Sequence, residues 1–323
     1  MTRLLRAVAA LLLSLTAAAP ALAQTPAWPS QPLRMLVGSS PGGGTDAMAR
    51  AVADKLGPAL KTTVVVENRP GASNTLAADV VAKSTDGHTM VMGVSTAHAI
   101  APHLIKLAYD NDRDLVPVAY VGAVPNVLVV SASSPYKTVA DLVAAARKQP
   151  GAINYASSGN GSTQHIAGEL FEDATGAATV HIPYRGSGPA LVDLMAGQVQ
   201  MSFDTLASVM PHIKNGKLRA LAVCAAARNP ELPNVPTLAE AGVKGVEMSA
   251  WYGIYMPAAT PKAVQQRVAE EVSKILTQPD TKTRLANIGA DLTPLTPAQF
   301  QAFHGAENKR YAELIKKRGI KAD

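Results

Sequence analysis

The chain has 323 residues, with 30 Lys and Arg against 24 Asp and Glu, and its formal net charge is +6. This small excess comes without a basic cluster interleaved with aromatics, so nucleic acid is excluded as a partner. Aromatic residues make up only 4%, which disfavours a sugar-stacking protein, and the single cysteine excludes an internal disulfide.

The first 23 residues predict export from the cytoplasm. Arg3 and Arg6 precede an apolar run from Ala7 to Leu15, and Ala21-Leu22-Ala23 has the A-x-A pattern of a cleavage site. The apolar run is shorter than the roughly 20 residues that a membrane-spanning helix needs. We therefore expect a signal peptide that is cleaved near Ala23.

The rest of the chain alternates between two patterns. Short apolar runs predict strands at 33–37, 63–66, 89–93, 118–121, 127–130, 153–156, 180–183, 200–203 and 218–223. Apolar residues at helical spacing predict helices at 46–56, 74–83, 139–148, 163–174, 190–195, 206–214 and 261–277. Alternation of this kind indicates βαβ units, with mostly parallel sheets flanked by helices.

The number of strands indicates two lobes. About a dozen strands would exceed what one sheet usually holds. We expect the chain to cross between lobes at residues 123–127 and to return at 248–253. We expect residues 24–124 and 249–323 to form lobe one and residues 125–248 to form lobe two, joined by a short hinge.

The loop after the first strand fits a hydrolase motif. Gly38-Ser39-Ser40-Pro41-Gly42 matches the G-x-S-x-G nucleophile elbow. In that motif the N–H after the nucleophile forms half of the oxyanion hole, and Pro41 has no N–H. A secreted serine hydrolase using Ser40 therefore remains only as the alternative from another class.

The same loop also fits a dinucleotide fingerprint. Residues 42–47 match G-x-G-x-x-A, and Glu67 follows Ala47 by 20 residues, about where a ribose-binding acid belongs. The motif lacks its third glycine, and an exported protein is a poor candidate for a nicotinamide enzyme. We predict no cofactor.

An anion site at a helix start explains the loop best. Thr45 or Asp46 is a suitable N-cap residue, and the helix dipole adds positive potential to the unpaired N–H groups. Loops of similar design occur at 157–163, where Ser162 or Thr163 would be the cap, at 182–189 and at 93–97. Because ligands bind at the carboxyl ends of strands in open α/β sheets, these loops could enclose a small carboxylate.

Six segments resemble one family. PGGGTD, VVVENRPGASN, NYASSGNGSTQHIAGELF, IPYRGSGPALVDLMAGQV, NVPTLAEAGVKGVE and WYGIYMPAATP are similar to the Bug family, the extracytoplasmic substrate-binding proteins of tripartite tricarboxylate transporters. The resemblance implies a two-lobed, type II-like periplasmic-binding-protein fold. It also implies a monomeric, non-enzymatic periplasmic protein without a metal, which passes a small carboxylate to membrane permease subunits. A ligand sensor for a membrane sensor kinase would share this fold and remains an alternative.

The resemblance carries ligand-binding residues onto this sequence. Those of the first lobe are Ser39, Ser40, Gly42, Gly43, Gly44, Thr45, Asp46, Ser95, Thr96 and Ala97. Those of the second lobe are Ser157, Ser158, Gly159, Asn160, Gly161, Ser162, Thr163, Gly186, Ser187 and Asp204. Asp204 could equally be the N-cap of the helix that follows it, Arg185 could pair with a distal carboxylate or be solvated, and His165 is more often a packing residue than a ligand. Dicarboxylates, tricarboxylates, amino acids and aromatic acids all stay open as ligands.

Overall fold

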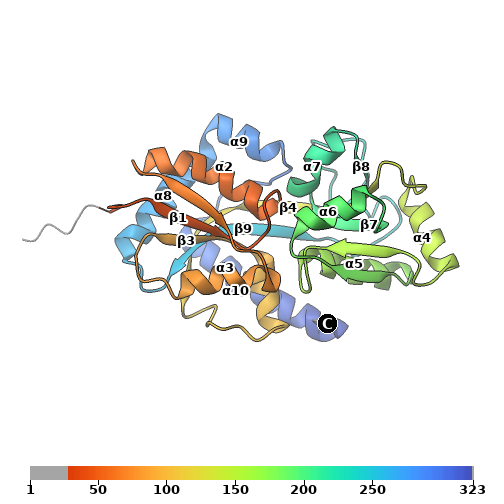
Figure 1. Cartoon of the computed structure of the whole chain (residues 1–323), viewed down its shortest axis with the longest axis horizontal. Coiled ribbons are helices and arrows are strands. Elements are labelled where there is room, and N and C mark those ends of the chain that lie inside the picture. Colours follow the sequence, from red (N-terminus) through yellow and green to blue (C-terminus); the bar gives the residue numbers. More distant parts are fainter. Residues whose placement is uncertain (1–27, 322–323) are drawn as a thin grey trace, which may run out of the picture. The chain divides into compact units, whose positions relative to one another are not determined.

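The computed structural model describes residues 28–321, and within this range strands and helices alternate along the chain (Figure 1). The predicted signal peptide and its cleavage site lie outside the described residues. From Gln31 onward the chain forms one compact unit. A search of residues 28–321 finds no helix with the length and apolar character needed to cross a membrane.

Lobe one takes its strands from both ends of this unit. β1 (Leu33–Val37) lies between β2 (Val64–Asn68) and β3 (Thr89–Val94) and is parallel to both. β9 (Ser249–Pro257) pairs antiparallel with β3. Every residue of β3 is buried, whereas the edge strand β2 is mostly half-buried. Burial on both faces explains why the central strands are continuous apolar runs.

Helices cover both faces of this sheet (Figure 1). On one face α2 (Gly44–Ala59) packs against α8 (Lys262–Thr277) and α9 (Pro279–Ala286). On the other face lie α3 (Thr75–Ala82) and α10 (Pro297–Arg318). Three short turns complete the lobe: η1 (Ala72–Asn74), the π-helical η2 (Thr96–Ile100) and η3 (Ala101–His103).

Lobe two is built from the middle of the chain. β5 (Asn154–Ser157) is parallel to β6 (Val180–Pro183) and to β7 (Met201–Thr205), and β8 (Leu218–Val223) pairs antiparallel with β4 (Leu115–Ser131). The helices of this lobe are α4 (Val139–Lys148), α5 (Thr163–Thr175), α6 (Ser187–Met195) and α7 (Leu206–Lys214). Because β5, β6 and β7 are parallel, the loops that start α5, α6 and α7 lie at the same edge of the sheet.

One long strand, β4 (Leu115–Ser131), joins the lobes, where two strands were predicted at 118–121 and 127–130, with a crossing between lobes at 123–127. Residues 115–125 pair antiparallel with β9, and residues 126–131 pair antiparallel with β7 and β8. The prediction of two separate strands was wrong because Pro125 stands where the pairing partner changes, so its missing N–H interrupts neither ladder. The described chain accordingly has nine strands rather than about a dozen. These nine strands form one continuous sheet, and its parts in both lobes are mixed, since β4 and β9 run antiparallel to their neighbours.

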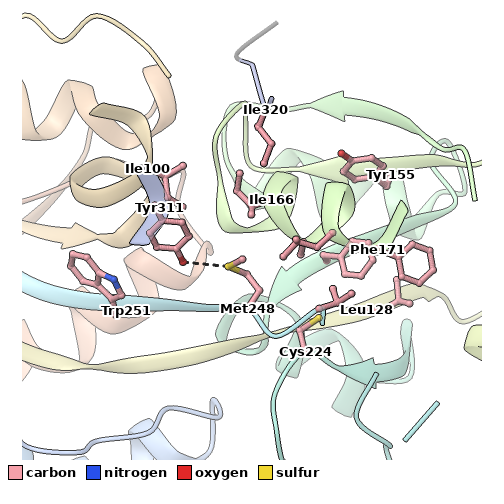
Figure 2. Close-up of a cluster of buried hydrophobic side chains, with 14 of the residues drawn as sticks. Ile100, Leu128, Tyr155, Ile166, Phe171, Cys224, Met248, Trp251, Tyr311 and Ile320 are labelled. Carbon is pink, nitrogen blue, oxygen red and sulfur yellow. Dashed lines mark hydrogen bonds between the residues drawn. The ribbon is translucent and has the colours of Figure 1, made fainter. Parts of the chain in front are cut away.

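A cluster of buried side chains runs from one lobe to the other (Figure 2). Leu128 and Phe171 belong to its part in lobe two, and Tyr311 of α10 donates its hydroxyl to Met248 Sδ at 3.3 Å. Cys224 is buried in the same cluster, and burial raises the pKa of its thiol. Burial therefore disfavours the thiolate form of Cys224.

Candidate functional site

A small inner cavity of about 20 Å³ lies between residues of the two lobes. Four helix starts line it: Gly44 and Thr45 of α2, Thr163 and Gln164 of α5, Ser187 of α6, and Thr205, the N-cap residue of α7. The other lining residues are Ser39, Asn74, Val94, Thr96, Ser158, Ala250 and Tyr252. None of these described residues carries a formal charge. The cavity is therefore surrounded by neutral hydrogen-bonding groups and by the positive ends of helix dipoles.

The start of α2 differs from the prediction. The N-cap residue is Gly43, with extended backbone, rather than Thr45 or Asp46, and it makes no side-chain cap within the described structure. Gly43 N–H instead donates to the carbonyl of Ser40 at 3.2 Å. The helix thus begins two residues earlier than its apolar spacing indicated, because three glycines before Thr45 permit the turn.

Asp46 holds this loop in place from inside the helix. Its carboxylate accepts hydrogen bonds from Gly42 N–H, Arg50 Nε and Asn68 Nδ2, each at 3.0 Å. Burial alone would raise the pKa of Asp46, but the hydrogen bonds from Arg50, Asn68 and Gly42 outweigh it and lower the pKa. Asp46 is therefore an ionised structural group that faces its own loop.

In lobe two the loop before α5 is also tied internally. Ser162 is the N-cap residue, as predicted, and its hydroxyl accepts from His165 N–H at 3.2 Å. His165 Nδ1 accepts from Gly161 N–H at 3.1 Å, and its ring stacks on His181 with centroids 4.2 Å apart. Ser157 Oγ lies 2.6 Å from His181 Nε2. The contacts of His165 agree with the packing role that was weighed against ligand binding.

A larger outer pocket of about 380 Å³ adjoins the inner cavity, since both are lined by Asn74 and Ser158. Its other lining residues are Gly38, Gly71, Ala72, Ser73, Ile105, Gly159, Asn160, Pro183, Tyr184, Arg185 and Gly186. Arg185 is exposed and is the one charged residue in this lining within the described chain. The two volumes therefore share part of their wall, and the outer pocket has a cation in its lining.

The lobes touch each other around this site. Ser40 Oγ of lobe one accepts from Gly188 N–H of lobe two at 3.3 Å, and Ser73 Oγ donates to the carbonyl of Asn160. The inner cavity has room for roughly one water molecule, whereas small-molecule sites usually span about 300–1,000 Å³. The structure therefore corresponds to closed lobes, and the lobes must separate for a ligand with a carbon skeleton to enter.

The structure distributes the predicted residues over several places. The inner cavity is lined by Ser39, Gly44, Thr45, Thr96, Ser158, Thr163 and Ser187. The outer pocket is lined by Ser158, Gly159, Asn160 and Gly186. Neither volume is lined by Ser40, Gly42, Gly43, Asp46, Ser95, Ala97, Ser157, Gly161, Ser162 or Asp204. Asp204 precedes the N-cap residue of α7 and is not that cap.

Sequence reasoning missed four polar residues of the inner-cavity lining, as well as Val94 and Ala250. Gln164 and Thr205 stand at helix starts after strands, so the pattern used for the other loops could have found them. Asn74 carries no such signal, because it reaches the cavity through three consecutive residues with positive φ, Ala72 to Asn74. Tyr252 lies on β9 and reaches the site only because the chain returns to lobe one.

The two other chemistries considered for the first loop lack the contacts they need. Glu67, the expected ribose ligand, forms a bidentate pair with Arg34 Nε and a second guanidinium nitrogen at 2.7 and 2.8 Å. Ser40, the expected nucleophile, is engaged with Gly188 N–H of the other lobe. No cluster of His, Cys, Asp or Glu that could hold a metal ion occurs in the part of the chain that the structure describes.

Two α/β lobes that close over a cavity lined by uncharged donors define a solute-binding protein of the periplasmic kind. The comparison with known families narrows this class. The family described as tripartite tricarboxylate transporter family receptor matches residues 48–320, and the chain belongs to this family. It is therefore a periplasmic solute-binding protein and not an enzyme.

Several relatives share nearly the whole chain. Protein BugT of Bordetella pertussis is 36% identical over 324 residues, which cover 99% of each chain. The structure of the R. palustris protein Rpa4515 with adipate matches with a TM-score of 0.88 and 36% identity over 91% of this chain and 99% of that chain. The periplasmic binding protein BugD gives a TM-score of 0.86 and 32% identity over 91% and 99%. MatC from Rhodopseudomonas palustris with bound malate gives 0.84 and 31% over 89% and 100%.

Proposed function

We propose that this protein captures a small carboxylate between its two lobes and delivers it to the membrane subunits of a tripartite tricarboxylate transporter. The observation that carries the proposal is the convergence of four helix starts, those of α2, α5, α6 and α7, on one cavity. Helix N-termini offer unpaired N–H groups and positive potential, and both favour an anion.

The lining chemistry supports a carboxylate over a cation or a sugar. Among the described residues that line either volume there is no Asp or Glu, so no carboxylate would contact a bound anion directly. The inner cavity has one aromatic lining residue, Tyr252, which is too little to stack sugar rings. Hydrogen bonds from neutral donors to a carboxylate are shorter and about twice as strong as neutral pairs.

The outer pocket suits the rest of the ligand. A carboxylate held at the helix starts would leave its carbon chain pointing into the volume of about 380 Å³, toward Arg185. Adipate in Rpa4515 and malate in MatC are both dicarboxylates, and these relatives make a dicarboxylate the first compound to test here.

Binding by closure requires a hinge. We propose that residues 24–124 and 249–323 move as lobe one against residues 125–248 as lobe two. Only β4 and β9 would then bend, since these strands pair with each other along residues 115–125 and continue toward lobe two. Strands of this kind can absorb a rotation through small backbone changes at a few residues.

A ligand screen tests the proposal. The mature chain from Gln24 would be titrated with malate, adipate, succinate, citrate and glutamate, with glucose and Mg²⁺ as controls. A ligand at 100 times its Kd should stabilise the fold by about 2.7 kcal/mol. Stabilisation by glucose or Mg²⁺ but by no acid would contradict the proposal. A gene deletion separates the two roles: lost uptake of the bound acid supports transport, whereas intact uptake with an altered transcriptional response supports a sensor.

A further inference from the structure

The carboxyl group of Asp204 lies fully buried in lobe two, directly behind the inner cavity. It stands on β7, where it is paired with Val127 of β4, and all five residues of β7 are buried. A buried carboxyl is costly unless donors surround it, so its partners indicate what it is for.

One oxygen of this carboxyl gathers a donor from each of three helix starts. Asp204 Oδ1 accepts from Ser187 Oγ at 2.8 Å, from Gln164 Nε2 at 3.1 Å and from Thr205 N–H at 2.7 Å. These three residues belong to the starts of α6, α5 and α7, and all three line the cavity. The other oxygen, Oδ2, has no partner among the described residues.

These bonds also orient the next residue along the cavity wall. Because the amide nitrogen of Gln164 points toward Asp204, its Oε1 faces Ser158 and accepts from Ser158 Oγ at 2.9 Å. Four lining residues are thus held, directly or through one neighbour, by a single carboxyl oxygen. Helix starts carry positive partial charge and repel one another, and an acidic group among them offsets that repulsion.

We propose that Asp204 is a positioning residue for ligand capture. It holds the starts of α5, α6 and α7 at the spacing that binds a carboxylate, and it does not itself contact that ligand. The inference rests on the proposed function. It differs from a purely structural role because the group lies next to the bound anion, so ligand affinity must respond to its charge.

The groups around Asp204 allow the dependence of ligand affinity on its charge to be measured. Gln164 of α5, Ser187 of α6, Ser208 of α7 and Tyr252 of β9 are the groups that face it, and only Tyr252 titrates. Burial raises the pKa of Tyr252, which stays neutral. Burial also raises the pKa of Asp204, although its hydrogen bonds with Ser187, Gln164 and Thr205 oppose the shift. A bound anion raises that pKa further, so binding should favour the protonated carboxyl.

Isothermal titration with malate and adipate tests the proposal on three variants. Asp204→Ala removes the shared acceptor and should raise Kd at least tenfold. Asp204→Asn keeps an oxygen facing the three donors and should bind within about threefold of wild type at mildly acidic pH. The ratio of the wild-type Kd to the Asp204→Asn Kd should then rise with pH. Because the ligand's own titration affects both Kd values equally, it cancels in this ratio.

Glu172→Ala is the matched control. Glu172 also lies in lobe two and accepts two hydrogen bonds, from Thr179 N–H and Thr179 Oγ1, but it lines neither volume. Its loss should leave Kd unchanged at every pH.

Three outcomes would each contradict the inference. A wild-type Kd in Asp204→Ala would overturn the inference while leaving the proposed function intact. If Asp204→Ala does not fold, a Kd ratio between wild type and Asp204→Asn that stays flat with pH would overturn it. If wild type binds no carboxylate, the proposed function and the inference both fail.

Discussion

Replacing Gly44 with alanine should oppose lobe closure while leaving lobe one folded. Gly44 is the first residue of α2 and lines the inner cavity. A Cβ at this position would lie 2.5 Å from Thr205 Oγ1, 2.8 Å from Tyr252 Oη and 3.4 Å from Ser208 Oγ. Thr205 and Ser208 belong to lobe two, so the added methyl group meets the opposite lobe.

The two energy terms of this change have opposite signs. Within lobe one, the preference of a helix for alanine over glycine, about 0.8–1.0 kcal/mol, partly offsets the contact of the new Cβ with Tyr252 Oη of β9. Overpacking against the other lobe costs about 1–3 kcal/mol. That cost corresponds to a roughly 5- to 150-fold shift from closed to open protein. The apparent Kd should rise by up to that factor, because only the closed form binds the ligand tightly and the apparent Kd scales inversely with the closed fraction.

Gly305→Ala provides the matched control for this measurement. Gly305 lies within α10, and a Cβ there would have no atom within 4 Å. Both variants would be compared with wild type by calorimetric titration of the best carboxylate, by thermal unfolding and by small-angle scattering without ligand. We expect wild-type affinity for Gly305→Ala, and weakened binding with a larger radius of gyration for Gly44→Ala. Equal Kd values for the two variants would refute the reasoning.

Three further predictions concern the hydrogen bond between Ser40 and Gly188, the core of lobe two and the pH dependence of stability. Ser40→Ala removes the acceptor of Gly188 N–H, a bond worth roughly 0.5–1.5 kcal/mol, so the ligand-free protein should scatter as a more open particle; an unchanged radius would contradict this. Phe203→Ala empties a fully buried site in lobe two and should cost about 3–5 kcal/mol in urea unfolding, and an unshifted midpoint would argue against that packing. Burial and, secondarily, the charge of His304 lower the pKa of His98 to about 3 from 6.5. In the unfolded chain His98 keeps its ordinary pKa, so it takes up a proton at a higher pH than in the folded protein. The stability that depends on the neutral ring is therefore fully present above about pH 6.5, and the free energy of unfolding should fall by about 1.4 kcal/mol per pH unit as the pH drops toward 3. His98→Gln should flatten that part of the urea-unfolding profile, and an equal slope in both proteins would count against the buried neutral ring.

Local patterns were sufficient for many of the elements and for part of the site, but they gave no strand for β9, no helix for α9 and no bounds for α10. The strand predicted at 33–37 is β1, and the helix predicted at 261–277 is α8 within one residue. The loop-to-helix pattern found Thr45, Thr163 and Ser187, which line the inner cavity. These successes depend on residue spacing and on small residues at helix starts, which are properties of neighbours in the chain.

Tertiary structure decided how these pieces meet. β4 is continuous through Pro125 because its partner changes there from β9 to β7, and no local signal reports a partner that is distant in the chain. Tyr252 and Asn74 reach the cavity for the same kind of reason.

The sequence by itself therefore determined a periplasmic-type α/β chain with several anion-suited helix starts. Only the folded chain decided that four of those starts share one cavity, with Asp204 buried among three of them. The physical reason is that backbone propensity acts over a few residues, whereas the meeting of Ser40 with Gly188, 148 positions apart, depends on the register of strands and the packing of lobes.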